Sequence, residues 1–151
     1  MPQAPAPVNS DAERQNLAIR VVLLPRDTNG MGTIFGGIIL SYIDQAGAVE
    51  AARFVTGKLV TVSLHEVVFH YPVFVGDLVS FYADVVKVGR TSITTRVVVE
   101  AERRGKGRGR VTVTEATVVY VHVDEGNRPI PVDLYPGPGL APRPLEEGEA
   151  G

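Results

Sequence analysis

In the second half of the chain, mostly apolar and mostly polar side chains alternate with a period of two. In segment 91–102 the two interleaved sets are Ile93, Thr95, Val97 and Val99, and Thr94, Arg96 and Glu100. Segments 78–88 and 110–124 show a similar alternation, and 17–24 and 60–73 are predicted as further extended segments. Such a period, with one covered face and one wet face, is typical of strands in an antiparallel sheet.

Residues 36–55 carry apolar side chains around most of a helical circumference and predict one long, largely buried helix. Small residues within it would let a sheet approach closely: Gly47, Ala48, Ala51 and Ala52. The order along the chain is therefore one strand, one helix and four strands joined by short links. We expect an α+β fold in which the helix covers the apolar face of a five-stranded antiparallel sheet.

Prolines mark the limits of the folded part. Nine of the eleven lie within the first seven residues or from Pro129 onward. Because proline is excluded from the interior of regular structure, we expect one domain over residues 16–131. Residues 1–15 are expected to form a disordered or loosely ordered tail, and residues 132–151 a tail rich in proline and glycine.

Composition removes several classes of site. The 151 residues include no cysteine, which excludes disulfides, thiolate zinc sites and cysteine nucleophiles. The three histidines, His65, His70 and His122, do not have metal-ligand spacing, so no metal is expected. The net charge of -2 gives no general attraction to nucleic acid. No apolar run reaches the length of a membrane span and the N-terminus lacks a signal-peptide pattern, so we expect a cytoplasmic protein without membrane insertion.

One acidic residue, Asp44, stands inside the predicted helix. At roughly 100° per residue, Arg53 lies about 180° and Glu50 about 240° from it, and these two are the expected solvent-facing charges. A carboxylate away from that stripe costs free energy unless it is partnered or belongs to a site. From helix geometry alone, a structural and a functional role for Asp44 are equally open.

Four glycines precede or begin the helix: Gly30, Gly32, Gly36 and Gly37. Glycine lets the backbone approach a ligand closely, and the first N–H groups of a helix have no partner within it. The loop would therefore direct backbone donors at an oxygen-rich group, although an ordinary glycine loop has the same composition. It is not a phosphate-binding P-loop, because no Gly-Lys-Ser/Thr follows.

Four separated motifs resemble those of hotdog-fold acyl-CoA thioesterases: "NGMGTIFGGIILSYIDQAG", "VTVSLHEVVFHYPVFVGDLV", "VGRTSI" and "TEATVVYVHVD". The resemblance covers about residues 19–131. It is greatest to the bacterial short- to medium-chain acyl-CoA hydrolases, which are related to the cytosolic brain acyl-CoA hydrolases of mammals. It implies a long central helix wrapped by an antiparallel sheet, in agreement with the pattern above.

The resemblance also implies the site. Asn29 and Asp44 match the family's asparagine and helical acid, so Asp44 would act as general base or nucleophile toward the thioester. Asn29 and the N–H of Gly36 or Gly37 would hold the water or the carbonyl oxygen, with Phe35 beside the glycines. In this family the site lies between two subunits, which implies at least a homodimer and further assembly as a trimer of dimers.

Coenzyme A would be held by cations. It is part of substrate and product, and no separate cofactor is expected. The turn at 87–92 offers Lys87, Gly89, Arg90, Thr91 and Ser92. A second basic turn, Arg103–Arg110, includes Arg108. Either turn could instead be an ordinary solvated hairpin.

Smaller signals complete the expectations. His65 is a candidate neighbour of the acyl group, and His65 with Glu66 suggests a β-bulge. Glu115 is expected to be structural, either buried and paired or displaced by a bulge. No histidine lies in the loop and helix motif, which argues against a hotdog dehydratase. The rival functions are a non-catalytic acyl-CoA-binding module and a hotdog thioesterase for acyl-carrier-protein or aryl thioesters.

Overall fold

The computed structural model describes residues 16–105, 107 and 109–134. Within them the chain forms, in order, β1 (Leu17–Val22), the 3-10 turn η2 (Pro25–Asp27), α1 (Gly36–Ala51), β2 (Lys58–His65), β3 (Leu78–Val88), β4 (Ser92–Arg103) and β5 (Gly109–Val123). All neighbouring strands are antiparallel, and their order across the sheet is β1-β3-β4-β5-β2. The predicted α+β architecture of one helix and five strands is confirmed.

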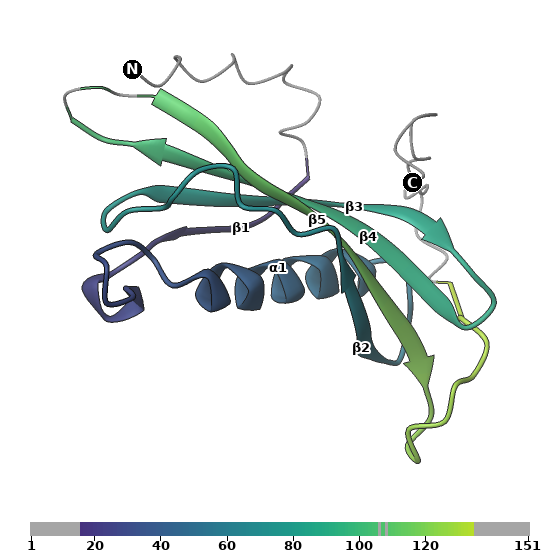
Figure 1. Cartoon of the computed structure of the whole chain (residues 1–151). Coiled ribbons are helices and arrows are strands. Elements are labelled where there is room, and N and C mark those ends of the chain that lie inside the picture. The colour runs from purple at the N-terminus through teal and green to yellow at the C-terminus, as the bar shows by residue number, and fades with distance from the viewer. Residues whose placement is uncertain (1–15, 106, 108, 135–151) are drawn as a thin grey trace.

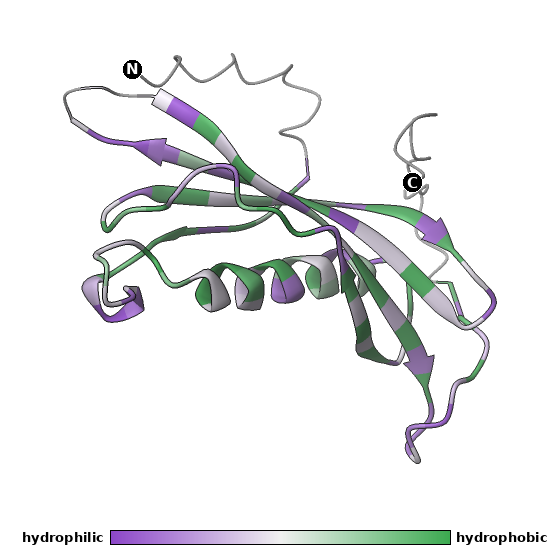
Figure 2. Ribbon diagram, viewed as in Figure 1, coloured by the Kyte–Doolittle hydropathy of each residue, from purple (hydrophilic) through white to green (hydrophobic). Residues whose placement is uncertain are grey.

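Helix α1 lies along one face of the curved sheet, as Figure 1 shows. Figure 2 shows hydrophobic and polar residues alternating along the strands, and a mostly hydrophobic helix against them. Ile39 and Ile43 of the helix and Val97 and Val99 of β4 are fully buried in the same core. The apolar residues at every second position of the strands thus form the sheet face that the helix covers. None of the helices in the described residues is long and apolar enough to cross a membrane.

The helix and the sheet approach most closely at Gly47. A Cβ added there would lie 2.6 Å from Thr95 Oγ1 and closer still to the Tyr120 hydroxyl. Both hydroxyls belong to buried residues of the sheet. The predicted role of small helical residues is therefore borne out at this position.

Gly47→Ala is expected to destabilise the fold by about 1–3 kcal/mol, because overpacking a closed interface forces side chains or backbone to shift. A chemical denaturation curve measures this change. Gly36→Ala is the matched control in the same helix, since its Cβ would lie 3.7 Å from the Phe69 ring in ordinary contact. Equal stability of the two variants would contradict the close approach at Gly47.

The helix ends at Ala51, four residues before the predicted limit of 55. The apolar pattern continues because Phe54 and Val55 are also buried, although Phe54 lies in the turn that follows and Val55 forms an isolated bridge with Leu134. The N–H groups of Phe54 and Val55 both donate to the carbonyl of Ala51, which closes the helix. The helix was predicted too long because these two residues, although outside it, also belong to the core.

The predicted extended segment 60–73 is divided in the structure. Strand β2 ends at His65, and Glu66 has a positive φ of 57°. The segment then returns to β5 farther along, where the N–H of His70 donates to the carbonyl of Val113 at 2.9 Å. The long apolar run is thus a short edge strand followed by a loop that crosses the sheet (Figure 1).

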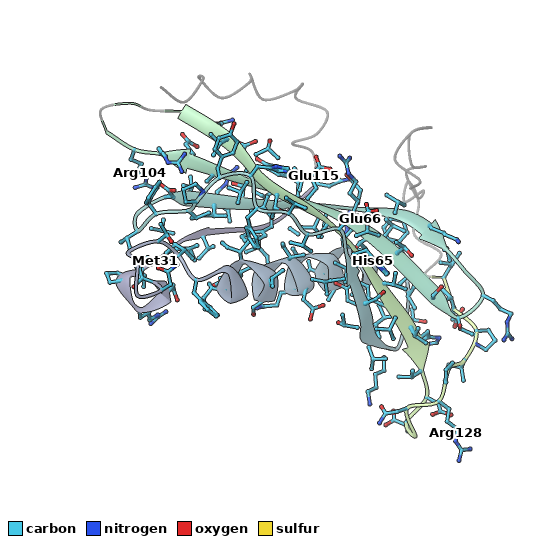
Figure 3. All side chains as sticks on the ribbon, viewed as in Figure 1. Met31, His65, Glu66, Arg104, Glu115 and Arg128 are labelled. Carbon is cyan, nitrogen blue, oxygen red and sulfur yellow. The ribbon has the colours of Figure 1, made fainter. Side chains whose placement is uncertain are left out.

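The bulge predicted at His65 and Glu66 is misplaced. The register of β2 shifts between Thr61 and Ser63 instead. A second register shift lies opposite Val99 and Glu100 of β4, where β5 contains one extra residue. Past this point Glu115 turns to the exposed face, away from the helix (Figure 3), and pairs with Arg96 at 2.9 Å. Of the two roles left open for Glu115, displacement by a bulge is the correct one.

The last described residues hold the turn between β3 and β4. The N–H of Val132 donates to the carbonyl of Arg90 at 2.8 Å, and His122 Nδ1 lies 2.8 Å from the carbonyl oxygen of Pro131. The backbone N–H of Thr56 donates to Asp133 at 3.1 Å. Residues 1–15 and 135–151, where most of the two predicted tails fall, lie outside the described residues.

Candidate active site

The N-terminus of α1 is open. Phe35 occupies the N-cap position without a side-chain hydrogen bond, and the residue is 56% exposed. The N–H of Ile38 donates to the Phe35 carbonyl. In the part of the chain that the structure describes, the N–H groups of Gly36 and Gly37 donate to no protein acceptor. The predicted pair of backbone donors, at the positive end of the helix dipole, is therefore available to a ligand.

Asn29 organises the loop before this helix. Its Oδ1 accepts the N–H groups of Met31 at 2.8 Å and Thr33 at 3.2 Å, and its Nδ2 donates to Thr33 Oγ1 at 2.8 Å. The backbone N–H of Asn29 also donates to the Thr33 carbonyl. The side-chain amide is thus held within its own loop, with one N–H of Nδ2 remaining for another acceptor.

Asp44 lies on a half-exposed side of α1, next to the edge strand β2. Its Oδ1 accepts the hydroxyl hydrogen of Thr61 at 2.7 Å. Its backbone carbonyl accepts the hydroxyl of Tyr120 at 2.6 Å. Sequence reasoning missed both partners, because Thr61 and Tyr120 are ordinary strand residues until the fold places them against the helix. The carboxylate is therefore partnered, oriented and still reachable from solvent.

The two acids of the helix exchange their expected environments. Glu50, predicted to face solvent, is only 5% exposed and pairs with Arg53 at 3.0 Å. Burial raises the pKa of Glu50, and the Arg53 guanidinium opposes that rise. Asp44, predicted to lie off the charged stripe, is the more accessible carboxylate. The predicted solvent exposure is therefore confirmed for Arg53 and wrong for Glu50.

Tyr120 is a neutral donor under the helix. Burial raises the pKa of its hydroxyl well above the usual value, and the negative charge of Asp44 adds to the shift. The phenol therefore keeps its proton at physiological pH. Its hydrogen bond to the Asp44 carbonyl fixes the height of the helix above the sheet at the position of the carboxylate.

A cleft opens beside the helix N-terminus. Its volume is about 330 Å³, and it is lined by Thr33, Ile34, Gly36 and Ile39 on one side and by residues 69–73 on the other. We call it the aromatic cleft, because Phe69 and Tyr71 stand at its surface with large exposed areas. Sequence reasoning treated residues 69–73 as part of a strand and so missed this feature.

One chain does not bring all the predicted catalytic groups together. Asp44 is eight residues beyond Gly36, which corresponds to about 12 Å along a helix axis. Among the described residues, the side chain of Asn29 forms its hydrogen bonds inside its own loop rather than with Asp44. His65, at the end of β2 (Figure 3), is exposed, and its Nε2 lies 2.8 Å from Ser63 Oγ.

The turn after β3 is held by its backbone. The N–H of Gly89 donates to the carbonyl of Ser92, and the N–H of His122 donates to the carbonyl of Thr91, each at 2.8 Å. Lys87, at the end of β3, and Arg90, on the turn itself, are both exposed. The predicted coenzyme A contacts at 87–92 therefore share a fixed turn from which two cations project.

Two cations of the second basic turn, Arg103 and Arg110, make contacts within the chain. Arg103 donates to the Pro72 carbonyl at 2.6 Å, lies 4.9 Å from the centre of the Phe74 ring and is 3.8 Å from Asp77. Arg110 approaches Glu100 at 3.6 Å and Glu102 at 3.5 Å. Arg104 projects from the same end of β4 (Figure 3). Arg108, also predicted to bind coenzyme A, lies outside the described residues.

The two basic turns lie at opposite ends of β4, as Figure 1 shows. Strand β4 has 12 residues, which span about 40 Å in an extended strand. Within one chain the turns therefore cannot hold the same nucleotide. The turn at 87–92 is the one closer to Asp44. Ile93, directly after this turn, pairs with Tyr120, and the Tyr120 hydroxyl donates to the Asp44 carbonyl.

Residues 31–108, slightly more than half of the chain, match the thioesterase superfamily. The chain belongs to this superfamily. Its fold is the hotdog fold: the solved structure of Cj0915, a hexameric hotdog-fold thioesterase of Campylobacter jejuni, is 42% identical with a TM-score of 0.74. That alignment covers 78% of this chain and 90% of Cj0915. The fold that the resemblance implied is confirmed.

Two further relatives name a substrate. The structure of HI0827, a hexameric broad-specificity acyl-coenzyme A thioesterase, is 38% identical with a TM-score of 0.74. The match covers 78% of this chain and 81% of HI0827. A Zymomonas mobilis protein named as an uncharacterized acyl-CoA thioester hydrolase, ZMO0511, is 47% identical over 87 residues. Those residues are 58% of this superfamily member and 57% of ZMO0511, so the match spans little more than half of that relative.

Proposed function

We propose that this thioesterase-superfamily protein hydrolyses acyl-CoA to a free carboxylic acid and coenzyme A. The observation that carries the proposal is the Asp44 carboxylate, oriented by Thr61 on a helix whose first N–H groups are open. The names of HI0827 and ZMO0511 support acyl-CoA as the substrate class. Another structure of HI0827 is that of its aspartate-to-alanine mutant enzyme.

Two routes use the same groups. In the first, Asp44 takes a proton from water, the water oxygen bonds to the thioester carbon, and the carbon–sulfur bond breaks with release of the thiolate. In the second, Asp44 attacks the carbonyl carbon itself, the carbon–sulfur bond breaks with release of the thiolate, and water then hydrolyses the mixed anhydride to the free acid and Asp44. In both, negative charge on the carbonyl oxygen is stabilised by N–H donors at Gly36 and Gly37.

We propose that the working site also needs a second copy of the chain. Strand β2 is an edge strand, and Val62 on it and Val49 on the adjacent helix face are about half exposed. Pairing of this edge with its copy would cover both residues and let Asn29 of one subunit approach Asp44 of the other. Cj0915 and HI0827 are hexameric, and we propose a trimer of dimers here. The substrate also favours a cytoplasmic location, because acyl-CoA is an intracellular metabolite.

Release of free thiol from acyl-CoAs, measured from acetyl to palmitoyl, tests the activity. Turnover of the series supports the proposal. Binding of acyl-CoA without turnover at any length would favour the acyl-CoA-binding module. Faster hydrolysis of acyl-carrier-protein or aryl thioesters than of any acyl-CoA would identify the other rival.

Two variants separate the roles of Asn29. Asn29→Asp keeps an oxygen that accepts the N–H groups of Met31 and Thr33 but has no N–H donor, whereas Asn29→Ala loses both functions. If the amide donates to water or substrate, both variants lose about a hundredfold in kcat/KM. Only Asn29→Ala is expected to lose roughly 1–2 kcal/mol of stability, seen in denaturation curves. Full activity of Asn29→Asp would reduce Asn29 to a loop-forming residue.

A further inference from the structure

We propose that the aromatic cleft, formed within one chain, holds the acyl group of the substrate and that Phe69 limits the acyl chain length. The proposal rests on the proposed hydrolysis of acyl-CoA and adds to it the part of the substrate that the catalytic residues do not address. The cleft is bounded by the helix N-terminus and by the loop that follows β2.

The position of Gly36 connects the cleft to the chemistry. This residue carries one of the open N–H donors and also lines the cleft. A Cβ on Gly36 would lie 3.7 Å from both Cε2 and Cζ of Phe69, so the tip of that ring stands against the first helical turn. A thioester whose carbonyl oxygen meets the Gly36 N–H would therefore have its acyl carbons beside the Phe69 ring.

The wall opposite the helix is fixed at several points. The N–H of His70 donates to the Val113 carbonyl at 2.9 Å, and the Val73 carbonyl accepts the N–H of Ile34 at 2.8 Å. Arg103 holds the Pro72 carbonyl at 2.6 Å from behind. Backbone bonds to two other elements thus set the distance between residues 69–73 and the helix. A wall held in this way gives the cleft a defined size.

The lining suits hydrocarbon. Ile34, Ile39 and Val73 form a buried apolar floor, while the Phe69 side chain stays at the surface. Of the described residues that line the cleft, none is Asp, Glu, Lys or Arg, and the polar side chains among them are those of Thr33, His70 and Tyr71. Its volume of about 330 Å³ is near the lower end of the roughly 300–1,000 Å³ found for small-molecule pockets. The cleft is therefore expected to accommodate short to medium acyl groups better than long ones.

The test is kcat/KM for even-numbered acyl-CoAs from two to sixteen carbons, measured on the full chain. For wild type, kcat/KM is expected to rise by up to about fourfold per methylene while the cleft fills, and then to stop rising. Phe69→Ala should move that break to chains longer by two or more carbons. Gly36→Ala, which adds a methyl group to the cleft and keeps the N–H, should move it to shorter chains.

Val75→Ala is the matched control. Val75 belongs to the same loop, is 45% exposed against 43% for Phe69, and does not line the cleft. It should leave the chain-length profile unchanged. The oligomeric state of each variant is measured by light scattering and should equal that of wild type.

Several results would overturn the proposal while leaving the hydrolase activity established. One is a change in kcat/KM by the same factor at all chain lengths in Phe69→Ala. Another is that Val75→Ala moves the chain length at which kcat/KM stops rising by as much as Phe69→Ala does. A third is dissociation of the assembly by Phe69→Ala, which would identify the cleft as a subunit contact. In contrast, absence of turnover by wild type at every chain length would remove the proposed function itself.

Discussion

Asp44→Asn is expected to lower kcat for acyl-CoA hydrolysis by about 10²–10⁴-fold, the usual contribution of a positioned general base. The amide cannot accept a proton from water at neutral pH, and it is a poor nucleophile. The substitution should preserve the fold, because an amide oxygen still accepts the Thr61 hydroxyl and the backbone carbonyl still accepts that of Tyr120. Thiol release measures the rate, and a denaturation curve confirms that the variant is folded.

Glu50→Gln is the matched control for this effect. It also neutralises a carboxylate of α1, but Glu50 is buried and pairs with Arg53. Its stability should change with pH relative to wild type while the turnover rate stays the same. Since the folded-state pKa of Glu50 is raised above 4.5, its contribution to wild-type stability declines as pH rises through the folded pKa. Wild-type rates in folded Asp44→Asn would show that the base or nucleophile is another residue.

Gly36→Pro is expected to lower kcat by about 10²–10³-fold, as does the removal of one oxyanion donor in other hydrolases. Proline removes the N–H at the first helical position, where it is otherwise well tolerated. Phe35, with φ of -61° and ψ of 127°, already has the extended conformation that residues before proline prefer. The helix should therefore still begin at residue 36, and the loss should come from the missing donor.

The rate of Gly36→Pro is best measured with acetyl-CoA, whose acyl group is too short to be obstructed by a ring at the mouth of the aromatic cleft. Gly36→Ala is again the control, because it adds a Cβ and retains the N–H. We expect acetyl-CoA turnover near the wild-type value in Gly36→Ala. An unchanged kcat in folded Gly36→Pro would exclude the Gly36 N–H as an oxyanion donor and leave that role to Gly37 or to another group.

Much of the fold follows from local pattern. The alternation along 91–102 predicted β4, and apolar residues around a full helical circumference predicted a buried helix beginning at Gly36. These predictions succeed because a strand and a helix present side chains with different periods, which a sequence displays directly. The need of Gly47 for close packing is visible for the same reason, since a helix that crosses a sheet closely requires small residues at the contact.

The remainder depended on tertiary structure. The register shift at Val62 of β2 and the one that turns Glu115 outward arise from pairing between strands, which local periodicity does not contain. The exposure of Asp44 and the burial of Glu50 depend on where the sheet ends beside the helix. Residues 60–73 have one apolar pattern, yet they form an edge strand and the wall of a cleft.

By itself, therefore, the sequence determined the element order, the open glycine-rich start of the helix and the presence of one acid within it. Only the folded chain decided that Thr61 and Tyr120 hold this acid and that Phe69 faces Gly36. The physical reason is that each of these contacts joins residues from different elements. Their separation in space is set by sheet order and strand register, and no local pattern of side chains encodes it.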